Sequence, residues 1–150
     1  MDEYAAALAE TVDEVLPGWV ERSVGRLVMA WQGVVPPEVL EAAVVAGQEA
    51  RREVGARLRR LLEADIDAQW TGPLDVLRAA VAYPTAVLQA AGVPPVRRDE
   101  FAERSFPDDV YDLTPATWSD VDERLHEPGL VWGAWKAKQF LDRRRAEGRR

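Results

Sequence analysis

The chain has 150 residues, of which 47% are hydrophobic and 30% are charged, with no cysteine and one histidine. This composition fits one folded domain and excludes disulfides, a thiol nucleophile and metal sites built on cysteine or several histidines. The net charge of -7 repels phosphate backbones, which disfavours a general nucleic-acid binder. Because the N-terminus is acidic and no long apolar run follows, we expect a cytoplasmic protein without a signal peptide or membrane span.

Apolar residues recur at intervals of three and four along the chain, which predicts helices throughout. The first helix is expected to run from Asp2 to Leu16, where Pro17-Gly18 interrupts it. A second helix restarts there, because proline suits the first helical position, and ends at Gly33, a typical helix C-cap.

The longest predicted helix covers residues 38–64 and follows Pro36-Pro37. At 1.5 Å per residue it would be about 40 Å long, so we expect it to form the central spine of a bundle. A heptad seam interrupted by Arg51 supports this helix, and its apolar members include Leu40, Val44, Val54 and Leu58.

Thr71-Gly72-Pro73 signals another helix start, with Thr71 or Gly72 as the cap. Apolar residues that stay in phase predict a single helix, kinked at Pro84, that stops at Gly92. A short helix over residues 98–104 and a loop over residues 105–113 are expected to follow.

Thr114-Pro115 predicts a helix that has Thr114 as its N-cap and runs to about Leu125. The last helix is expected from Glu127-Pro128 to about Arg145, with residues 146–150 frayed. The chain is therefore expected to form one all-α domain over residues 1–150, a bundle of six or seven helices. Its expected core residues are Leu40, Val44, Val54, Leu58, Leu61, Leu77, Val81, Leu88, Trp118, Leu130 and Trp135.

Two groups of polar residues resemble metal sites in composition. Asp122, Glu123 and His126 can share one helix face, and the last two have the Glu-x-x-His spacing of di-iron bundles, but those sites need a second histidine, which the chain lacks. Asp108, Asp109 and Asp112 lack the glycine turn and the terminal glutamate of a calcium loop. We interpret the first group as a histidine near a helix C-terminus that pairs with the neighbouring carboxylates. We interpret the second group as a solvated turn, and we expect no metal or cofactor.

Sequence patterns of nucleophilic hydrolysis and phosphate binding are missing. None of Ser23, Ser105 and Ser119 lies in Gly-x-Ser-x-Gly, and no glycine-rich phosphate loop occurs. We therefore expect a protein that is not an enzyme, while a mechanism based on carboxylates alone stays open.

Five arginines between Arg51 and Arg60 follow one flank of the predicted spine, and residues 143–150 form a basic tail. A nucleic-acid-associated accessory protein would contact phosphates through these residues. Because glutamates interrupt the arginine run, a solvated helix face is the simpler interpretation.

The last helix carries a wider apolar face than a single packing seam requires. Trp135 lies on one side of it, whereas Trp132 and Phe140 lean away. We predict that Trp132 and Phe140 anchor a partner, with Lys136 and Arg143 steering an acidic protein or a second copy of the chain. Alternatively, Trp132 lies in the domain's own core.

The segments RDEFAER at residues 98–104 and SFPDDVYDLTPATWSDVDERLHEPGLVWGAWKAK at residues 105–138 resemble a family of small helical proteins from high-GC actinobacteria. The resemblance covers about residues 74–150 and implies no activity or site. Our functional prediction is a non-catalytic interaction protein, an adaptor or regulator, with the nucleic-acid accessory as the alternative.

Overall fold

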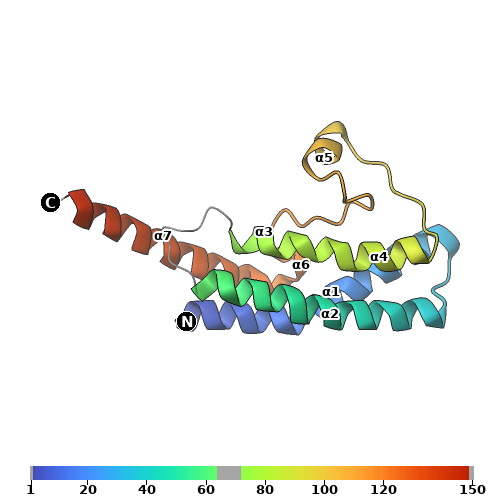
Figure 1. Cartoon of the computed structure of the whole chain (residues 1–150), viewed down its shortest axis with the longest axis horizontal. Helices are drawn as coiled ribbons and strands as arrows, with labels where there is room; N and C mark the ends of the chain where they lie inside the picture. Colours follow the sequence, from blue (N-terminus) through green and yellow to red (C-terminus); the bar gives the residue numbers. More distant parts are fainter. Residues whose placement is uncertain (1, 64–71, 149–150) are drawn as a thin grey trace.

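The computed structural model describes residues 2–63 and 72–148. Within these ranges the chain forms helices joined by turns and loops and contains no strand, so the predicted all-α class is confirmed. Two long helices lie side by side, a shorter helical layer packs along them, and the last helix runs past one end of the bundle (Figure 1). Three parts of the predictions above lie outside the described ranges: residue 64 of the predicted spine, the cap candidate Thr71, and residues 149–150 of the tail.

Helix α1 covers Glu3–Gln32 without a break, so the predicted interruption at Pro17-Gly18 is wrong. It begins at Asp2, whose carboxylate accepts hydrogen bonds from the backbone of Tyr4 and Ala5, and ends at Gly33 in the left-handed conformation. Proline removes one backbone hydrogen bond. Buried residues on both sides of Pro17 stay in one helical phase, and their shared packing holds the helix through it.

Helix α2 covers Pro37–Glu63, which confirms the helix predicted there, and packs antiparallel to α1. The longest helix is α1 instead of α2, and the last helix packs on α1. Close approach is possible because small residues face α1: a Cβ added to Gly47 would lie only 3.0 Å from the backbone of Pro17. The buried seam is Ala43, Ala46, Gly47, Ala50, Val54, Gly55, Leu58 and Leu62.

The next layer is helical from residue 73 to residue 90, in three parts. Helix α3 (Pro73–Arg78), the 3-10 turn η2 (Ala79–Val81) and helix α4 (Ala82–Ala90) follow one another directly. The tightened turn lies just before Pro84, as expected for a proline kink. Gly92 then adopts positive φ after the helix has ended, which confirms the predicted stop.

The segment after Gly92 carries only the short helix α5 (Glu100–Ser105), which stands apart from the main layers (Figure 1). Two buried polar groups fix the rest of this segment. The hydroxyl of Tyr111 donates to the carbonyl of Val93 at 2.7 Å. The carboxylate of Asp109 accepts from the backbone N–H groups of Leu113 and Thr114 and from the Thr114 hydroxyl.

Because its hydroxyl bonds to Asp109, Thr114 caps no helix, and the helix predicted from Pro115 is wrong. Helix α6 covers only Trp118–Val121 and is capped by Thr117. The 3-10 turn η3 (Glu123–Leu125) leads directly into helix α7 (His126–Gly148), which stays helical where fraying after Arg145 was predicted.

The predicted core is partly confirmed. Val54, Leu58, Leu77, Val81 and Leu88 are buried, while Leu61, Trp118 and Trp135 are half-buried against the core. The prediction is wrong for three residues that are exposed, namely Leu40, Val44 and Leu130. Leu40 and Val44 lie about five helical turns before the buried Leu58 and Leu62, so they are on the same side of α2; they are exposed because they lie toward the α1–α2 connection, where residues 29–34 are exposed as well.

Candidate functional site

The predicted anchor Trp132 is buried, with 8% of its surface exposed, so its placement on an open strip is wrong. The face of α7 that carries it packs on α1, where the rings of Trp135 and Tyr4 lie 5.8 Å apart. One turn earlier, Gly129 leaves room for the indole of Trp118, which an added Cβ would meet at 2.5 Å. Trp132 therefore fastens α7 to the bundle.

The two cations predicted to flank the strip differ in their surroundings. The ammonium of Lys136 lies 5.8 Å from the ring centre of Trp132 and 5.9 Å from that of Trp135. Lys136 is half-buried and covers the tryptophan pair instead of flanking an open surface. Arg143 is exposed on the part of α7 that extends beyond the bundle.

A second apolar face of α7 points outward. At about 100° per residue, Leu130, Ala134, Ala137 and Leu141 fall on one stripe, with Phe140 about 60° beyond Ala137 and Trp132 on the opposite side. Leu130 is 56%, Phe140 44% and Leu141 53% exposed. The helix thus has two apolar faces as predicted, but we assigned Trp132 to the wrong one. The five residues of the outward face are called the outer stripe below.

The second half of α7 has no support from the bundle. Every residue from 137 to 148 is exposed, and this segment projects past the N-terminus of α1 (Figure 1). It is basic, with four cations (Lys138, Arg143, Arg144 and Arg145) and two acidic residues (Asp142 and Glu147). The guanidinium of Arg144 lies 5.9 Å from the ring centre of Phe140.

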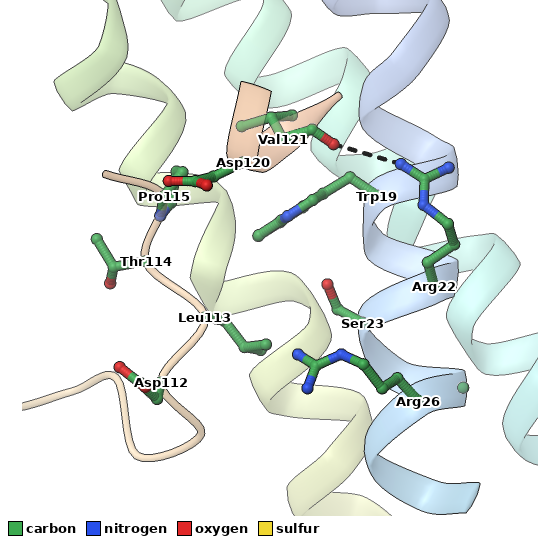
Figure 2. A pocket seen from close by; sticks show the side chains of 11 residues that line it. Trp19, Arg22, Ser23, Arg26, Asp112, Leu113, Thr114, Pro115, Asp120 and Val121 are labelled. Atoms are coloured by element: carbon green, nitrogen blue, oxygen red, sulfur yellow. Dashed lines mark hydrogen bonds between the residues drawn. The ribbon is translucent and has the colours of Figure 1, made fainter. Parts of the chain in front are cut away.

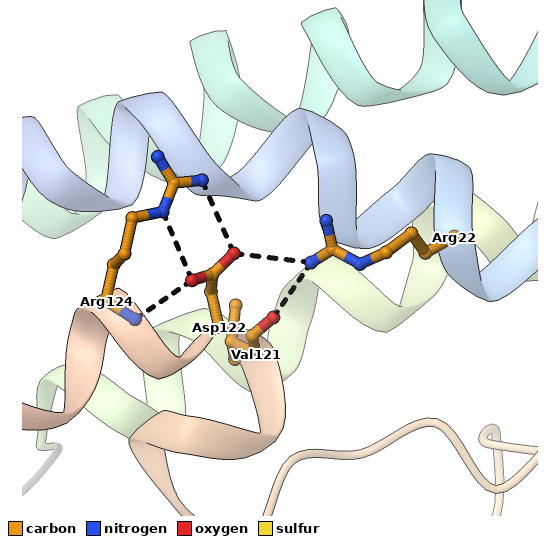
Figure 3. A network of polar contacts seen from close by, with 4 residues as sticks. All are labelled: Arg22, Val121, Asp122 and Arg124. Atoms are coloured by element: carbon orange, nitrogen blue, oxygen red, sulfur yellow. Dashed lines mark hydrogen bonds and ion pairs between the residues drawn. The ribbon is translucent and has the colours of Figure 1, made fainter.

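A polar corner fixes the direction in which α7 leaves the bundle (Figure 3). The carboxylate of Asp122 accepts from the backbone N–H of Arg124 at 2.9 Å and pairs with the guanidinium groups of Arg124 and Arg22. Arg22 also donates to the carbonyl of Val121 at 3.3 Å. Burial opposes ionisation of Asp122, but the two arginines and the N–H outweigh it, so the pKa of Asp122 lies below its ordinary value.

A cavity of about 700 Å³ lies next to this corner, between α1 and the segment over residues 112–121 (Figure 2). Trp19 extends across it, and Arg22 and Arg26 line the α1 side. Asp112 and Asp120 line the opposite side, so the charges balance and the cavity favours neither anions nor cations.

A groove of about 780 Å³ lies between α2 and α4. Its floor is made of small apolar residues, among them Ala42, Ala46 and Ala86. Four glutamates of α2 line it, namely Glu38, Glu41, Glu49 and Glu53. The hydroxyl of Tyr83 on α4 donates to Glu53; burial and this negatively charged acceptor raise the pKa of Tyr83 to about 12.

The side chains considered as metal ligands either make other hydrogen bonds or do not lie together. Asp109 is buried and its carboxylate is occupied by three hydrogen bonds, so it is no solvated turn residue. His126 is the first residue of α7, not the neighbour of an α-helix C-terminus, and is exposed. Within residues 2–63 and 72–148, no three acidic or histidine side chains are placed to hold a metal ion.

The arginine flank of α2 is only partly available for phosphate contacts. Arg59 pairs with Asp13 of α1, and this carboxylate raises the pKa of Arg59. The other four arginines of the flank are exposed: Arg51, Arg52, Arg57 and Arg60.

Comparison with protein-family models, curated proteins and solved structures finds no match to this chain. None of the helices in the described part of the chain is long and apolar enough to cross a membrane.

Sequence reasoning missed the groove because it sought large apolar residues on the spine. A signal was present: Glu38, Glu41, Glu49 and Glu53 fall within about 120° of helix circumference and border a run of alanines. The burial of Asp109 had no comparable signal, because its partners are backbone N–H groups that only the folded loop brings to it.

Proposed function

We propose that this chain is a non-catalytic, cytoplasmic protein–protein interaction module, an adaptor or regulator that binds its partner through the outer stripe of α7. The observation that carries the proposal is a helical segment, residues 137–148, that is exposed on all sides and holds Phe140 and Leu141 open to solvent. The resemblance to small actinobacterial helical proteins is part of the proposal and adds no activity to it.

Physical chemistry supports a covered state for this segment. An isolated helix of about 12 residues is marginal in water, because nucleation is unfavourable and little apolar surface is buried. Exposed aromatic and aliphatic residues in a row are typical of helices that dock into a groove of another protein. Phe140 therefore keeps its predicted anchoring role, and Leu141 replaces Trp132 as the second anchor.

The proposal is tested by capture of partners from native lysate with a tagged chain. The double substitution Phe140→Asp and Leu141→Asp is expected to abolish capture, because it places two charges where apolar contact is needed. Gln139→Asp with Ala146→Asp is the matched control: it adds the same charges to exposed positions off the stripe and should capture normally.

A nuclease-treated sample separates the alternative function. If nuclease releases all captured material, and substitution of Arg51, Arg52 and Arg60 prevents its capture, the chain is a nucleic-acid accessory and the proposal is wrong. Equal capture by the stripe variant and the wild type would also overturn it.

A further inference from the structure

The basic half of α7 and the groove between α2 and α4 are complementary surfaces of one chain. Residues 137–148 of α7 carry an excess of positive charge next to the outer stripe. The groove has an apolar floor and four glutamates, so it offers the opposite charge next to an apolar surface. Such a pair matches the way an amphipathic helix binds in a groove.

The sizes of the two surfaces agree as well. From Glu38 to Glu53 the groove-lining part of α2 is about 22 Å long, at 1.5 Å per residue. The basic half of α7, residues 137–148, is about 17 Å long by the same measure, so it fits within this length. Alanines on both surfaces, among them Ala137 on the stripe and Ala86 in the groove, permit the close approach of backbones.

Within a single chain the two surfaces cannot meet. Trp132 fastens α7 against α1, and α7 continues as one helix to Gly148, so its basic half points away from the α2–α4 layer (Figure 1). Only an α7 from another molecule can enter the groove.

We propose that the groove between α2 and α4 binds the basic half of α7 from a second copy of this chain. This inference rests on the proposed function and names the partner. Lys138 and Arg145 flank the outer stripe and meet the glutamates of the groove, while Leu141 and Ala137 contact its alanine floor. Because the two surfaces differ, a single docking contact would extend from one molecule to the next; we infer a closed dimer, in which two chains exchange their helices and each fills the groove of the other.

Charge reversal on both surfaces tests this docking. The groove variant carries Glu41→Lys and Glu49→Lys, and the tail variant carries Lys138→Glu and Arg145→Glu; all four positions are exposed. Each variant is expected to weaken dimerisation at least about tenfold, because like charges then face each other. A chain that carries all four substitutions restores opposite charges and should dimerise like the wild type.

The mass in solution is measured by sedimentation velocity and light scattering over a range of concentrations and at low and high salt. The wild type is expected to form a dimer that salt weakens, since these charges are exposed and screened. Circular dichroism confirms that each variant folds.

Three results would overturn the inference: a wild type that stays monomeric at every concentration, a groove variant that dimerises normally, or a fourfold variant that fails to recover. A monomeric wild type whose capture of another protein still depends on Phe140 and Leu141 would leave the proposed function intact. A wild type that neither self-associates nor captures a partner through the outer stripe would overturn both proposals.

Discussion

Residues 126–136 of α7 lie against the bundle, whereas residues 137–148 of the same helix are exposed throughout. Both halves contain large apolar side chains, so composition does not separate them. The difference lies in what faces each half. Trp118, Gly129 and α1 provide a fitted surface for the first half, and the bundle ends before the second half begins. Whether an apolar residue on α7 is buried thus depends on its turn and, in the first half, on its face, since Leu130 in that half is exposed.

The largest expected loss of stability comes from truncating Trp132, which packs the first half of α7 against the bundle. Trp132→Ala should lower the free energy of unfolding by about 3–5 kcal/mol, because a large buried aromatic side chain is lost and a cavity remains. Urea denaturation measures this change. The matched variant Phe140→Ala, on the exposed half, should change the free energy of unfolding by less than about 0.5 kcal/mol. Equal effects of the two substitutions would contradict the division of α7 into two halves.

A smaller loss of stability is expected from a substitution in the loop between α5 and α6, where Asp109 is buried. Asp109→Ala leaves the N–H groups of Leu113 and Thr114 without their acceptor, which should cost about 1–3 kcal/mol of unfolding free energy. Thermal and chemical denaturation report this loss, and Asp108→Ala at the exposed neighbouring position is the control. If both alanine variants are equally stable, the Asp109 hydrogen bonds do not hold this segment.

The sequence predicts those parts of the fold that depend on neighbouring residues, and it fails where contacts between distant segments decide the structure. The α2 helix, the proline kink before Pro84 and the left-handed Gly33 follow from short-range spacing and backbone preference, and they were predicted. The continuity of α1 through Pro17 depends on packing against α2, which a local rule for proline does not include.

The candidate site was predicted in outline and missed in detail. Periodicity indicated two apolar faces on α7, but it does not say which face meets the bundle. That choice depends on tertiary contacts: Trp118 packs against Gly129, and Asp122 pairs with Arg22, which lies 100 positions earlier in the sequence. The groove was overlooked for a related reason, because it requires α4 to lie beside α2.

The corner at Asp122 predicts a pH dependence of moderate size. Since the pKa of Asp122 is lower in the folded state than in the unfolded chain, its ionised form stabilises the fold. This contribution is fully present above the ordinary aspartate pKa and is lost as the pH falls through the lowered value.

Asp122→Asn should therefore reduce the free energy of unfolding at neutral pH by about 1 kcal/mol, since its arginine partners are largely exposed. The difference from the wild type should shrink as the pH falls below the ordinary aspartate pKa. Denaturation at a series of pH values measures it, and a difference that stays constant with pH would contradict the role of the ionised carboxylate.

The smallest effect on stability is expected from deleting residues 138–150. The described part of this segment, up to Gly148, is exposed, so its loss should change the free energy of unfolding by less than about 0.5 kcal/mol. The deletion removes six basic and two acidic residues from an already acidic chain, which strengthens repulsion between the remaining carboxylates. Denaturation at high salt removes this electrostatic part. The same deletion should abolish self-association, so the exposed half of α7 would be dispensable for folding and required for binding. A large loss of stability in the monomer at high salt would instead show that the bundle depends on the second half of α7.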